Sequence, residues 1–231
     1  MANWRIAVLA IAVLVVPFRS EACRLALALA IDVSTSVDQR DYTLQRNGLA
    51  NAIRSPEVKD AFLSSGMPVA IAAFEWSGPH NQRVILDWTL MTSAEIMEGA
   101  ADRIESIERF PTGFPTSLGN ALSFGAEMMS SAPGCERFTV DVSGDGRNNN
   151  GYPPEVAYRD PAFVDIGVNA LAIGGSEPLG SLVEYFRESV IRGNGAFVEV
   201  ARNHEEFEAA MRRKLIREVT VLVMSQVNNK R

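Results

Sequence analysis

The sequence predicts an α/β fold: a doubly wound, mostly parallel six-stranded sheet with one antiparallel edge strand and helices on both faces. Short apolar runs alternate with amphipathic stretches along the chain, which is the pattern of consecutive βαβ units. The 231 residues are 47% hydrophobic and 22% charged, which leaves enough apolar material for one sizeable core. One connection, at residues 77–79, is a short Ser-Gly-Pro turn that predicts a hairpin instead of a crossover.

Residues 1–22 have the pattern of an export signal and are set apart from the fold. Arg5 supplies a positive start, residues 6–16 are an unbroken apolar run, and residues 20–22 end the segment in a small-x-small pattern. The apolar run is shorter than the roughly 20 residues that a membrane-spanning helix needs, so we expect no stable membrane anchor. Cleavage at the end of this segment predicts a periplasmic or secreted product.

The remaining chain is expected to form a domain over residues 23–219 and a tail over residues 220–231. No internal repeat, low-complexity block or linker marks a second domain. The formal net charge of -6 and the isoelectric point near 5.1 argue against nucleic acid as a partner, because phosphates are attracted by a basic face. We expect a monomer.

The first part of the domain predicts three strands and one helix. The apolar run at residues 25–31 is the first buried strand, and the helix over residues 38–53 places its apolar residues on one side. Pro56 marks the end of that helix. The runs at residues 69–74 and 83–88 are joined by the short turn, so the second of them is expected to be the antiparallel edge strand.

Two helices are expected after the edge strand. Thr92 and Glu95 have the spacing of a capping box, which predicts a helix that runs to about Ile107. A loop with proline and glycine at residues 111–115 separates it from the next helix, at residues 117–129.

The second half of the chain continues the alternation of strands and helices. Phe207, Met211 and Leu215 repeat every fourth residue and are expected to lie in the core. The expected elements are a strand at 138–142, a loop at 144–154, a helix from there to 164, a strand at 168–173, a helix at 179–190, a strand at 196–200 and a helix at 205–218.

Hydroxyl and carboxylate side chains follow two strands that the fold places side by side. Asp32, Ser34 and Ser36 come after the first strand, and a Gly-Asp-Gly segment at residues 144–146 comes after the fourth. Doubly wound sheets bind ligands where the crossovers of neighbouring strands run to opposite sides, at the carboxyl ends of those strands. Alternate residues of an extended loop face the same way, so the three side chains can present their oxygens to one point.

These residues resemble the metal-ion-dependent adhesion site of a von Willebrand factor type A (vWA) domain. The Asp-x-Ser-x-Ser motif is present as Asp32, Ser34 and Ser36. Thr116 stands ahead of a Gly-x-Ala-Leu helix, and Asp145 stands in an Asp-Gly pair after an apolar strand, as in that family. The resemblance covers nearly the whole mature chain, which looks like an exported bacterial family of such domains with no assigned function.

The resemblance implies a bound Mg²⁺, with Mn²⁺ or Ca²⁺ as alternatives. It implies that Ser34, Ser36 and Thr116 are direct ligands, while Asp32 and Asp145 act through water or orient the hydroxyls. A cation with so few negative ligands stays electrophilic, and its open position would attract an aspartate or glutamate of a protein partner. The implied function is a metal-dependent protein-binding module that is not an enzyme.

Two features depart from the family pattern. The family has Ser or Thr directly before Asp-Gly, whereas here Gly144 is inserted between Ser143 and Asp145, which predicts a small displacement of the aspartate. The following segment, residues 147–151, contains three consecutive asparagines, and we expect it to form a flexible rim near the ligand.

The two cysteines of the mature chain, Cys23 and Cys135, precede the first and fourth strands. Both therefore fall at the amino ends of strands that are neighbours in this fold, on the side opposite the metal motif. An exported chain meets an oxidising compartment, so we predict a structural disulfide that contributes about 2–4 kcal/mol.

Two local alternatives exist for the motif residues. Ser36 or Asp38 could simply cap the first helix. The segment from Asp141 to Gly146 also resembles the start of an EF-hand calcium loop, but Tyr152 stands at the twelfth position where that loop needs a glutamate.

Two other functions are alternatives to the binding module. An exported metal-dependent hydrolase would need a general base beside the cation, and the only histidines, His80 and His204, are in no catalytic arrangement and are expected at the surface. The other alternative is a structural domain with a degenerate metal site, which the inserted Gly144 makes conceivable.

Overall fold

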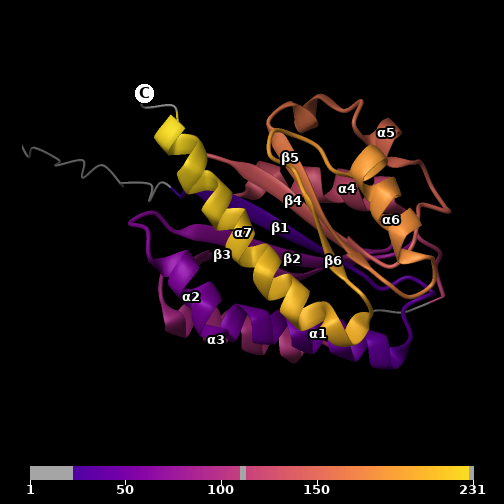
Figure 1. Cartoon of the computed structure of the whole chain (residues 1–231), viewed down its shortest axis with the longest axis horizontal. Coiled ribbons are helices and arrows are strands. Elements are labelled where there is room, and N and C mark those ends of the chain that lie inside the picture. The colour runs from indigo at the N-terminus through magenta and orange to yellow at the C-terminus, as the bar shows by residue number, and fades with distance from the viewer. Residues whose placement is uncertain (1–22, 110–112, 229–231) are drawn as a thin grey trace, which may run out of the picture.

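The computed structural model describes residues 23–109 and 113–228, with side chains described as far as Thr220. Its centre is a six-stranded sheet with helices on both faces (Figure 1), as the sequence predicts. The strands are β1 (Leu25–Asp32), β2 (Val69–Trp76), β3 (Gln82–Met91), β4 (Phe138–Gly144), β5 (Ile166–Ile173) and β6 (Val198–Ala201). Their spatial order is β3-β2-β1-β4-β5-β6, and only the β2–β3 pair is antiparallel.

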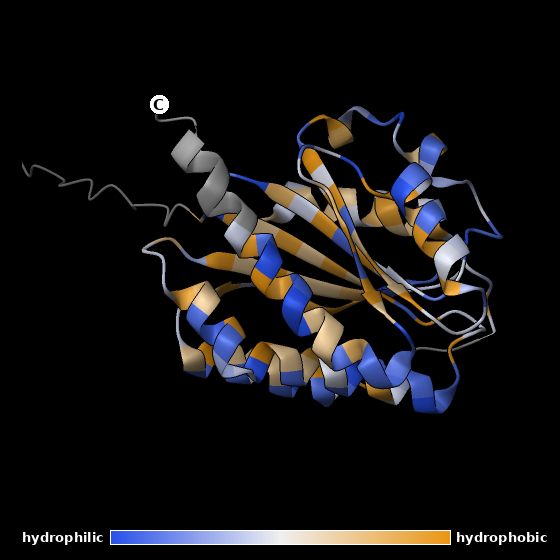
Figure 2. Cartoon of the chain, viewed as in Figure 1, coloured by the Kyte–Doolittle hydropathy of each residue, from blue (hydrophilic) through white to orange (hydrophobic). Residues whose placement is uncertain are grey.

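The helices form one layer on each side of the sheet, and Figure 2 shows hydrophobic residues along the strands between the layers. One layer consists of α1 (Gln39–Arg54), α2 (Pro56–Leu63), α3 (Ala94–Glu105) and α7 (Phe207–Asn228). The other layer consists of α4 (Leu118–Met128), α5 (Pro154–Ala157) and α6 (Leu179–Tyr185). The shorter turns are η1 (Met129–Ser131), η2 (Pro161–Val164), the π-helical η3 (Phe186–Val190) and η4 (His204–Glu206).

The central strand β1 shows how the sequence creates two different faces. Alternate side chains point to opposite faces, and every residue of β1 is buried because helices cover both. Leu27 and Leu29 fill the side of α1 and α7, whereas Ala28 lies on the side of α4. On that side α4 packs closely, since a Cβ on Gly125 would lie 2.9 Å from Val140 Cγ1.

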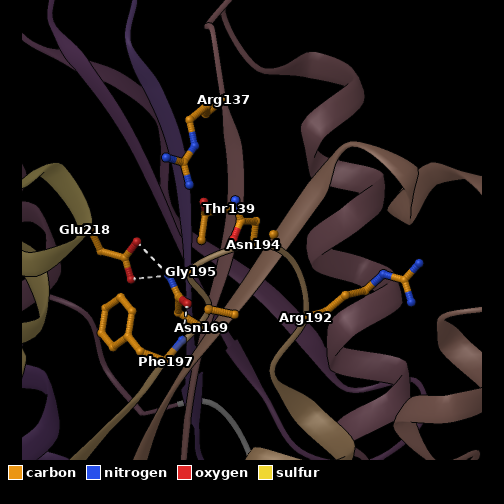
Figure 3. Close-up of a pocket in the computed structure, with 10 residues that line it drawn as sticks. Arg137, Thr139, Asn169, Arg192, Asn194, Gly195, Phe197 and Glu218 are labelled. Atoms are coloured by element: carbon orange, nitrogen blue, oxygen red, sulfur yellow. Dashed lines mark hydrogen bonds between the residues drawn. The ribbon is translucent and has the colours of Figure 1, made fainter. Parts of the chain in front are cut away.

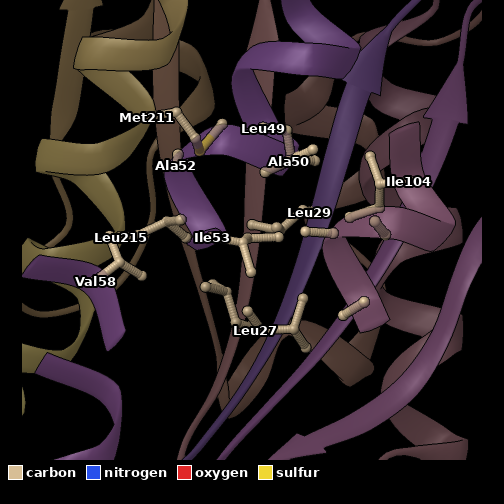
Figure 4. Close-up of a cluster of buried hydrophobic side chains, with 14 of the residues drawn as sticks. Leu27, Leu29, Leu49, Ala50, Ala52, Ile53, Val58, Ile104, Met211 and Leu215 are labelled. Carbon is tan, nitrogen blue, oxygen red and sulfur yellow. The ribbon is translucent and has the colours of Figure 1, made fainter. Parts of the chain in front are cut away.

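The larger hydrophobic cluster joins α1, α7 and the leucine face of β1 (Figure 4). Leu49 and Ile53 of α1 are buried in it. Phe207, Met211 and Leu215 of α7 are also part of the cluster, as their spacing predicts. Burial of an aliphatic side chain of this size stabilises the fold by about 1.5–3 kcal/mol, so this cluster is the main attachment of α7 to the sheet.

A buried charged network lies between α7 and the strands β4 and β5. Lys214 Nζ lies 2.9 Å from Asp141 Oδ2 and 3.0 Å from Glu218 Oε1, and all three side chains are buried. Asn169 donates to both carboxylate oxygens of Glu218 and accepts from the Phe197 amide, as the close-up in Figure 3 shows. Burial raises the pKa of Asp141 to about 7, although the charge of Lys214 opposes that rise.

Pro56 begins a helix, α2, that the sequence analysis did not predict. Ser55 ends α1 and also caps α2, since its Oγ accepts from the Val58 amide. Proline is favoured at the first position of a helix because the missing N–H has no partner there anyway. Ser55 therefore ends α1 and caps α2, and Pro56 is the first residue of α2.

Other element bounds differ from the prediction in detail. The helix α3 is capped by Ser93, whose Oγ accepts from the Ile96 amide, so the predicted cap at Thr92 is wrong by one position. The helix expected after the fourth strand is split into α5 and η2. The helix α7 continues past Glu218 to Asn228.

Cys23 and Cys135 form the predicted disulfide, with their Cα atoms 4.3 Å apart. It joins the segments that lead into β1 and β4, at the amino ends of the two central strands. The proposed export segment, residues 1–22, lies outside the described residues. Within the part of the chain that the structure describes, no helix combines the length and apolarity needed to span a membrane.

Candidate metal centre

The candidate site lies at the carboxyl ends of β1 and β4, where the strand order reverses. Asp32 is the last residue of β1, and the chain then turns before α1 begins. Asp38 is the residue that caps α1, because its Oδ1 accepts from the Asp41 amide at 2.8 Å. Ser36 is thus not needed as a helix cap, and its hydroxyl turns toward β4.

The hydroxyls predicted as ligands form a chain of short contacts. Ser34 Oγ lies 3.2 Å from Ser36 Oγ, and Thr116 Oγ1 lies 3.3 Å from Ser34 Oγ. Ser36 Oγ donates to Asp145 Oδ1 at 2.7 Å. Three separate segments of the chain therefore bring oxygen atoms to one place.

Asp32 lies beneath this cluster and is fully buried. Its Oδ1 accepts from the Ser34 amide at 2.7 Å, while its Oδ2 has no hydrogen-bond partner among the described residues. Burial, and to a lesser extent the charge of Asp145, raises the pKa of Asp32 to about 7. Burial also raises the pKa of Asp145. Two buried carboxylates this close repel each other, and a cation between them would relieve the repulsion.

The donor set fits a hard divalent cation. No cluster of three or more His, Cys, Asp or Glu side chains that could hold a metal occurs within the described part of the chain, so a cation here would depend on hydroxyls as well as carboxylates. Mg²⁺ prefers six oxygen ligands and retains several waters. Ser34, Ser36 and Thr116 would hold such an ion, with Asp32 and Asp145 beside them; the bound ion would supply an electrophilic position.

The inserted Gly144 lies against the carboxylate of Asp32. A Cβ at position 144 would lie 3.2 Å from Asp32 Oδ2, a contact tighter than usual, so glycine gives this carboxylate room at the end of β4. Asp145 nevertheless reaches the cluster through its bond to Ser36. The insertion therefore leaves the five predicted residues together.

The loop predicted as a flexible rim is instead tied to the site by hydrogen bonds. Asn148 Oδ1 accepts from the Leu118 amide at 2.7 Å and from the Gly119 amide at 3.4 Å, at the start of α4. Asn149 Oδ1 accepts from the Thr116 amide at 2.9 Å. Side-chain caps of this kind satisfy amides that a helix start leaves unpaired. The asparagine segment thus fixes the loop that carries Thr116.

A cavity of about 320 Å³ opens beside the hydroxyl cluster. Ser176 and Glu177, which the sequence analysis did not assign to the site, form part of its wall, and Ser176 Oγ donates to Asp145 O at 2.6 Å. They follow β5, the next parallel strand, so the rule that identified the other loops could have found them. The cavity is lined by Thr35, Ser36, Pro115, Thr116, Gly146, Arg147, Asn149, Ser176 and Glu177.

The two histidines differ in their environment. His80 is exposed as expected, but His204 is buried, so the prediction of a surface residue is wrong there. His204 Nδ1 lies 3.6 Å from Asp41 Oδ1, and the positive charge that the ring carries when protonated would lower the pKa of the nearby Asp145. His204 does not line the cavity.

Solved structures define the class of this fold: it is that of the vWA domain. Proximal thread matrix protein 1 from the mussel byssus matches with a TM-score of 0.60 at 16% identity, over 86% of this chain and 48% of its own. A von Willebrand factor type A protein from Catenulispora acidiphila matches with a TM-score of 0.59 at 15% identity, over 84% of this chain and 42% of its own. The mussel protein is also known with a zinc-occupied MIDAS motif, in a structure that matches with a TM-score of 0.55 at 15% identity, over 85% of this chain and 46% of its own. This chain spans less than half the length of these proteins.

The chain belongs to the family described as protein of unknown function (DUF1194), whose model matches residues 22–223. A comparison with curated protein sequences gives no match.

Proposed function

We propose that this protein is an exported binding module that grips an acidic group of a partner protein through a divalent cation. The cation is held by Ser34, Ser36 and Thr116, with Asp32 and Asp145 beside them. It leaves one coordination position open to the cavity, where an aspartate or glutamate of the partner binds.

The observation that carries this proposal is the convergence of hydroxyl and carboxylate oxygens around an unpartnered oxygen. Asp32 Oδ2 is buried without a hydrogen-bond partner in the described chain, and a buried carboxylate oxygen in that state is unfavourable. A cation bound in the adjoining hydroxyl cluster would offset the cost of burying this carboxylate oxygen. The zinc-occupied MIDAS motif of the mussel protein supports metal binding on this fold, and the pilus adhesin of Lactobacillus rhamnosus GG, with a TM-score of 0.58 at 14% identity over 84% of this chain and 30% of its own, supports an adhesive role.

Metal binding is tested by calorimetric titration of the metal-stripped protein with Mg²⁺, Mn²⁺ and Ca²⁺. We expect one site per chain, and Asp32→Asn should lose most of the affinity because it removes a negative charge without changing shape. Asp60→Asn is the matched control, since Asp60 is an exposed carboxylate on α2. Absence of binding in the unmodified protein would mean that the metal site is degenerate, which is the structural alternative.

Partner binding is tested by capturing proteins from the native extracellular or periplasmic fraction with and without a chelator. A partner retained only when Mg²⁺ is present, and lost from the Asp32→Asn protein, is the expected result. A partner retained equally under both conditions contradicts a metal-dependent grip.

The hydrolase alternative has little support in the cavity. Glu177 is the only carboxylate among the residues that line it, and its two oxygens lie 2.8 Å from the amide and 3.1 Å from Nε of Arg147. Both contacts stabilise the ionised carboxylate and so make it a weaker general base for the attacking water. Turnover of ester, phosphate or peptide substrates by the metal-loaded protein would favour the hydrolase instead.

Export is supported by the disulfide between Cys23 and Cys135, because such bonds persist in oxidising compartments. We expect the mature protein to begin at Cys23 and to be a monomer. Amino-terminal sequencing of the protein from the native extracellular or periplasmic fraction checks the first expectation, and light scattering after gel filtration checks the second.

A further inference from the structure

Asn149 connects the proposed ligand Thr116 with the open side of the cavity. The Thr116 amide donates to Asn149 Oδ1 at 2.9 Å, and the Asn149 amide donates to Thr116 O at 3.0 Å. An amide N–H needs an acceptor, so this bond determines which end of the Asn149 side chain faces Thr116. The carbonyl oxygen Oδ1 faces the Thr116 amide, and the NH₂ group, Nδ2, therefore points away from that amide.

The Nδ2 group of Asn149 is free to bind a ligand. Within the described chain it takes part in no hydrogen bond, while Asn149 is exposed and lines the cavity together with Ser36 and Thr116. A side-chain NH₂ offers two donors and no acceptor, and a carboxylate offers only acceptors. The free end of Asn149 is therefore complementary to a carboxylate oxygen.

The guanidinium of Arg147, the other side chain with nitrogen donors in the cavity wall, is partly engaged by the protein itself. Arg147 Nε lies 3.1 Å from Glu177 Oε2, and its Nη2 donates to Ser181 O at 3.0 Å. The Arg147 side chain also lies over the ring of Tyr185. Asn149 differs from Arg147 in that its other end is bonded to the amide of the proposed ligand Thr116, so its donor is held beside the metal site.

We propose that Asn149 is a specificity-determining residue that donates a hydrogen bond from Nδ2 to the partner's carboxylate. Nδ2 of Asn149 holds the carboxylate oxygen that does not bind the cation, while Oδ1 of Asn149 keeps the Thr116 amide in place. A carboxamide is disfavoured when its own NH₂ group faces Nδ2, so the site selects aspartate or glutamate over asparagine or glutamine. This inference rests on the proposed function.

The test is the Asn149→Asp variant, which keeps an acceptor for the Thr116 amide but replaces the NH₂ donor with an oxygen. Mn²⁺ affinity is measured by calorimetry, and acetate and acetamide are then titrated into the Mn²⁺-loaded protein while water-proton relaxation is recorded. Because the variant adds a negative charge, we expect it to bind Mn²⁺ at least as tightly as the unmodified protein. We expect its acetate affinity to fall about tenfold or more, as a charge-assisted hydrogen bond is lost.

Asn150→Asp is the matched control. It places the same charge one residue further on, at a side chain that does not line the cavity, and at physiological salt its effect on acetate should stay within about threefold. The unmodified protein should prefer acetate to acetamide.

Two results would overturn the inference while leaving the proposed function intact: equal acetate affinity in the unmodified and Asn149→Asp proteins, or an equal loss in Asn150→Asp. An unmodified protein that binds no Mn²⁺, or that binds Mn²⁺ but no acetate, overturns the proposed function as well. The two titrations of the unmodified protein therefore separate the two failures.

Discussion

Ser36 Oγ donates a hydrogen bond to Asp145 Oδ1 over 2.7 Å, although the two residues are 109 positions apart in the chain. The bond joins the loop after β1 to the loop after β4, and these strands are neighbours at the centre of the sheet. The two halves of the proposed metal site therefore meet at this bond.

Replacing Ser36 with alanine should lower the affinity for Mg²⁺ by about tenfold or more, because a ligand and the partner of Asp145 are both lost. The change should also lower the stability of the metal-free protein by about 1–3 kcal/mol, because the buried carboxylate of Asp145 loses a hydrogen-bond donor although Ser36 itself is exposed. Calorimetric titration and thermal unfolding measure the two effects. Ser64→Ala, at an exposed serine after α2, is the control, and an equal affinity in both variants would remove Ser36 from the ligand set.

Reduction of the Cys23–Cys135 disulfide should lower the free energy of unfolding by about 2–4 kcal/mol, because the bond limits the freedom of the unfolded chain. Urea unfolding with and without a reductant measures the change. The double variant Cys23→Ser with Cys135→Ser should not respond to the reductant. The disulfide lies at the amino ends of the strands and the metal site at their carboxyl ends, so Mg²⁺ affinity should be the same with and without the reductant. A large loss of Mg²⁺ affinity on reduction would show that the disulfide and the metal site are coupled.

The sheet and the position of the candidate site could be predicted because both depend on regular patterns. A strand buried on both faces is a continuous apolar run, as in β1, and the carboxyl ends of neighbouring strands in such a sheet face one crevice. Asp32 and Asp145 were placed together by this rule alone. The disulfide followed from the same strand order.

The features that were missed depend on contacts that form only in the folded chain. Pro56 is compatible with both the end and the start of a helix, and the cap from Ser55 decides between them. Three asparagines in a row are typical of a mobile turn, yet Asn148 and Asn149 bond to amides some thirty residues away. His204 is buried although nothing in its local sequence indicates it.

At pH 8, above the pKa of Asp141, replacing Lys214 with methionine should destabilise the fold by about 3–5 kcal/mol, because it leaves the buried carboxylates of Asp141 and Glu218 without a counter-charge. Adding Asp141→Asn and Glu218→Gln to this variant should recover much of the loss, since no buried charge then remains. Arg212→Met, on the same helix, is the control and should change the stability by less than about 0.5 kcal/mol. Urea unfolding measures the free energy of unfolding of each variant. A small change for Lys214→Met would mean that the carboxylates of Asp141 and Glu218 are solvated or neutral.

The stability of the metal-free protein should fall as the pH rises from about 4 to about 7. The pKa of Asp141 is about 7 in the folded protein and near its usual value of 3.8 in the unfolded chain, so between these values the folded state holds a proton that the unfolded state has lost. The free energy of unfolding then decreases with pH by up to about 1.4 kcal/mol per unit for this group, and it levels off outside the window. Burial raises the pKa of Asp32 in the same sense, so Asp141→Asn should remove only part of the slope. Urea unfolding of both proteins in chelator-containing buffers from pH 4 to pH 8 measures the difference; equal slopes would show that Asp141 is ionised throughout, held by the charge of Lys214.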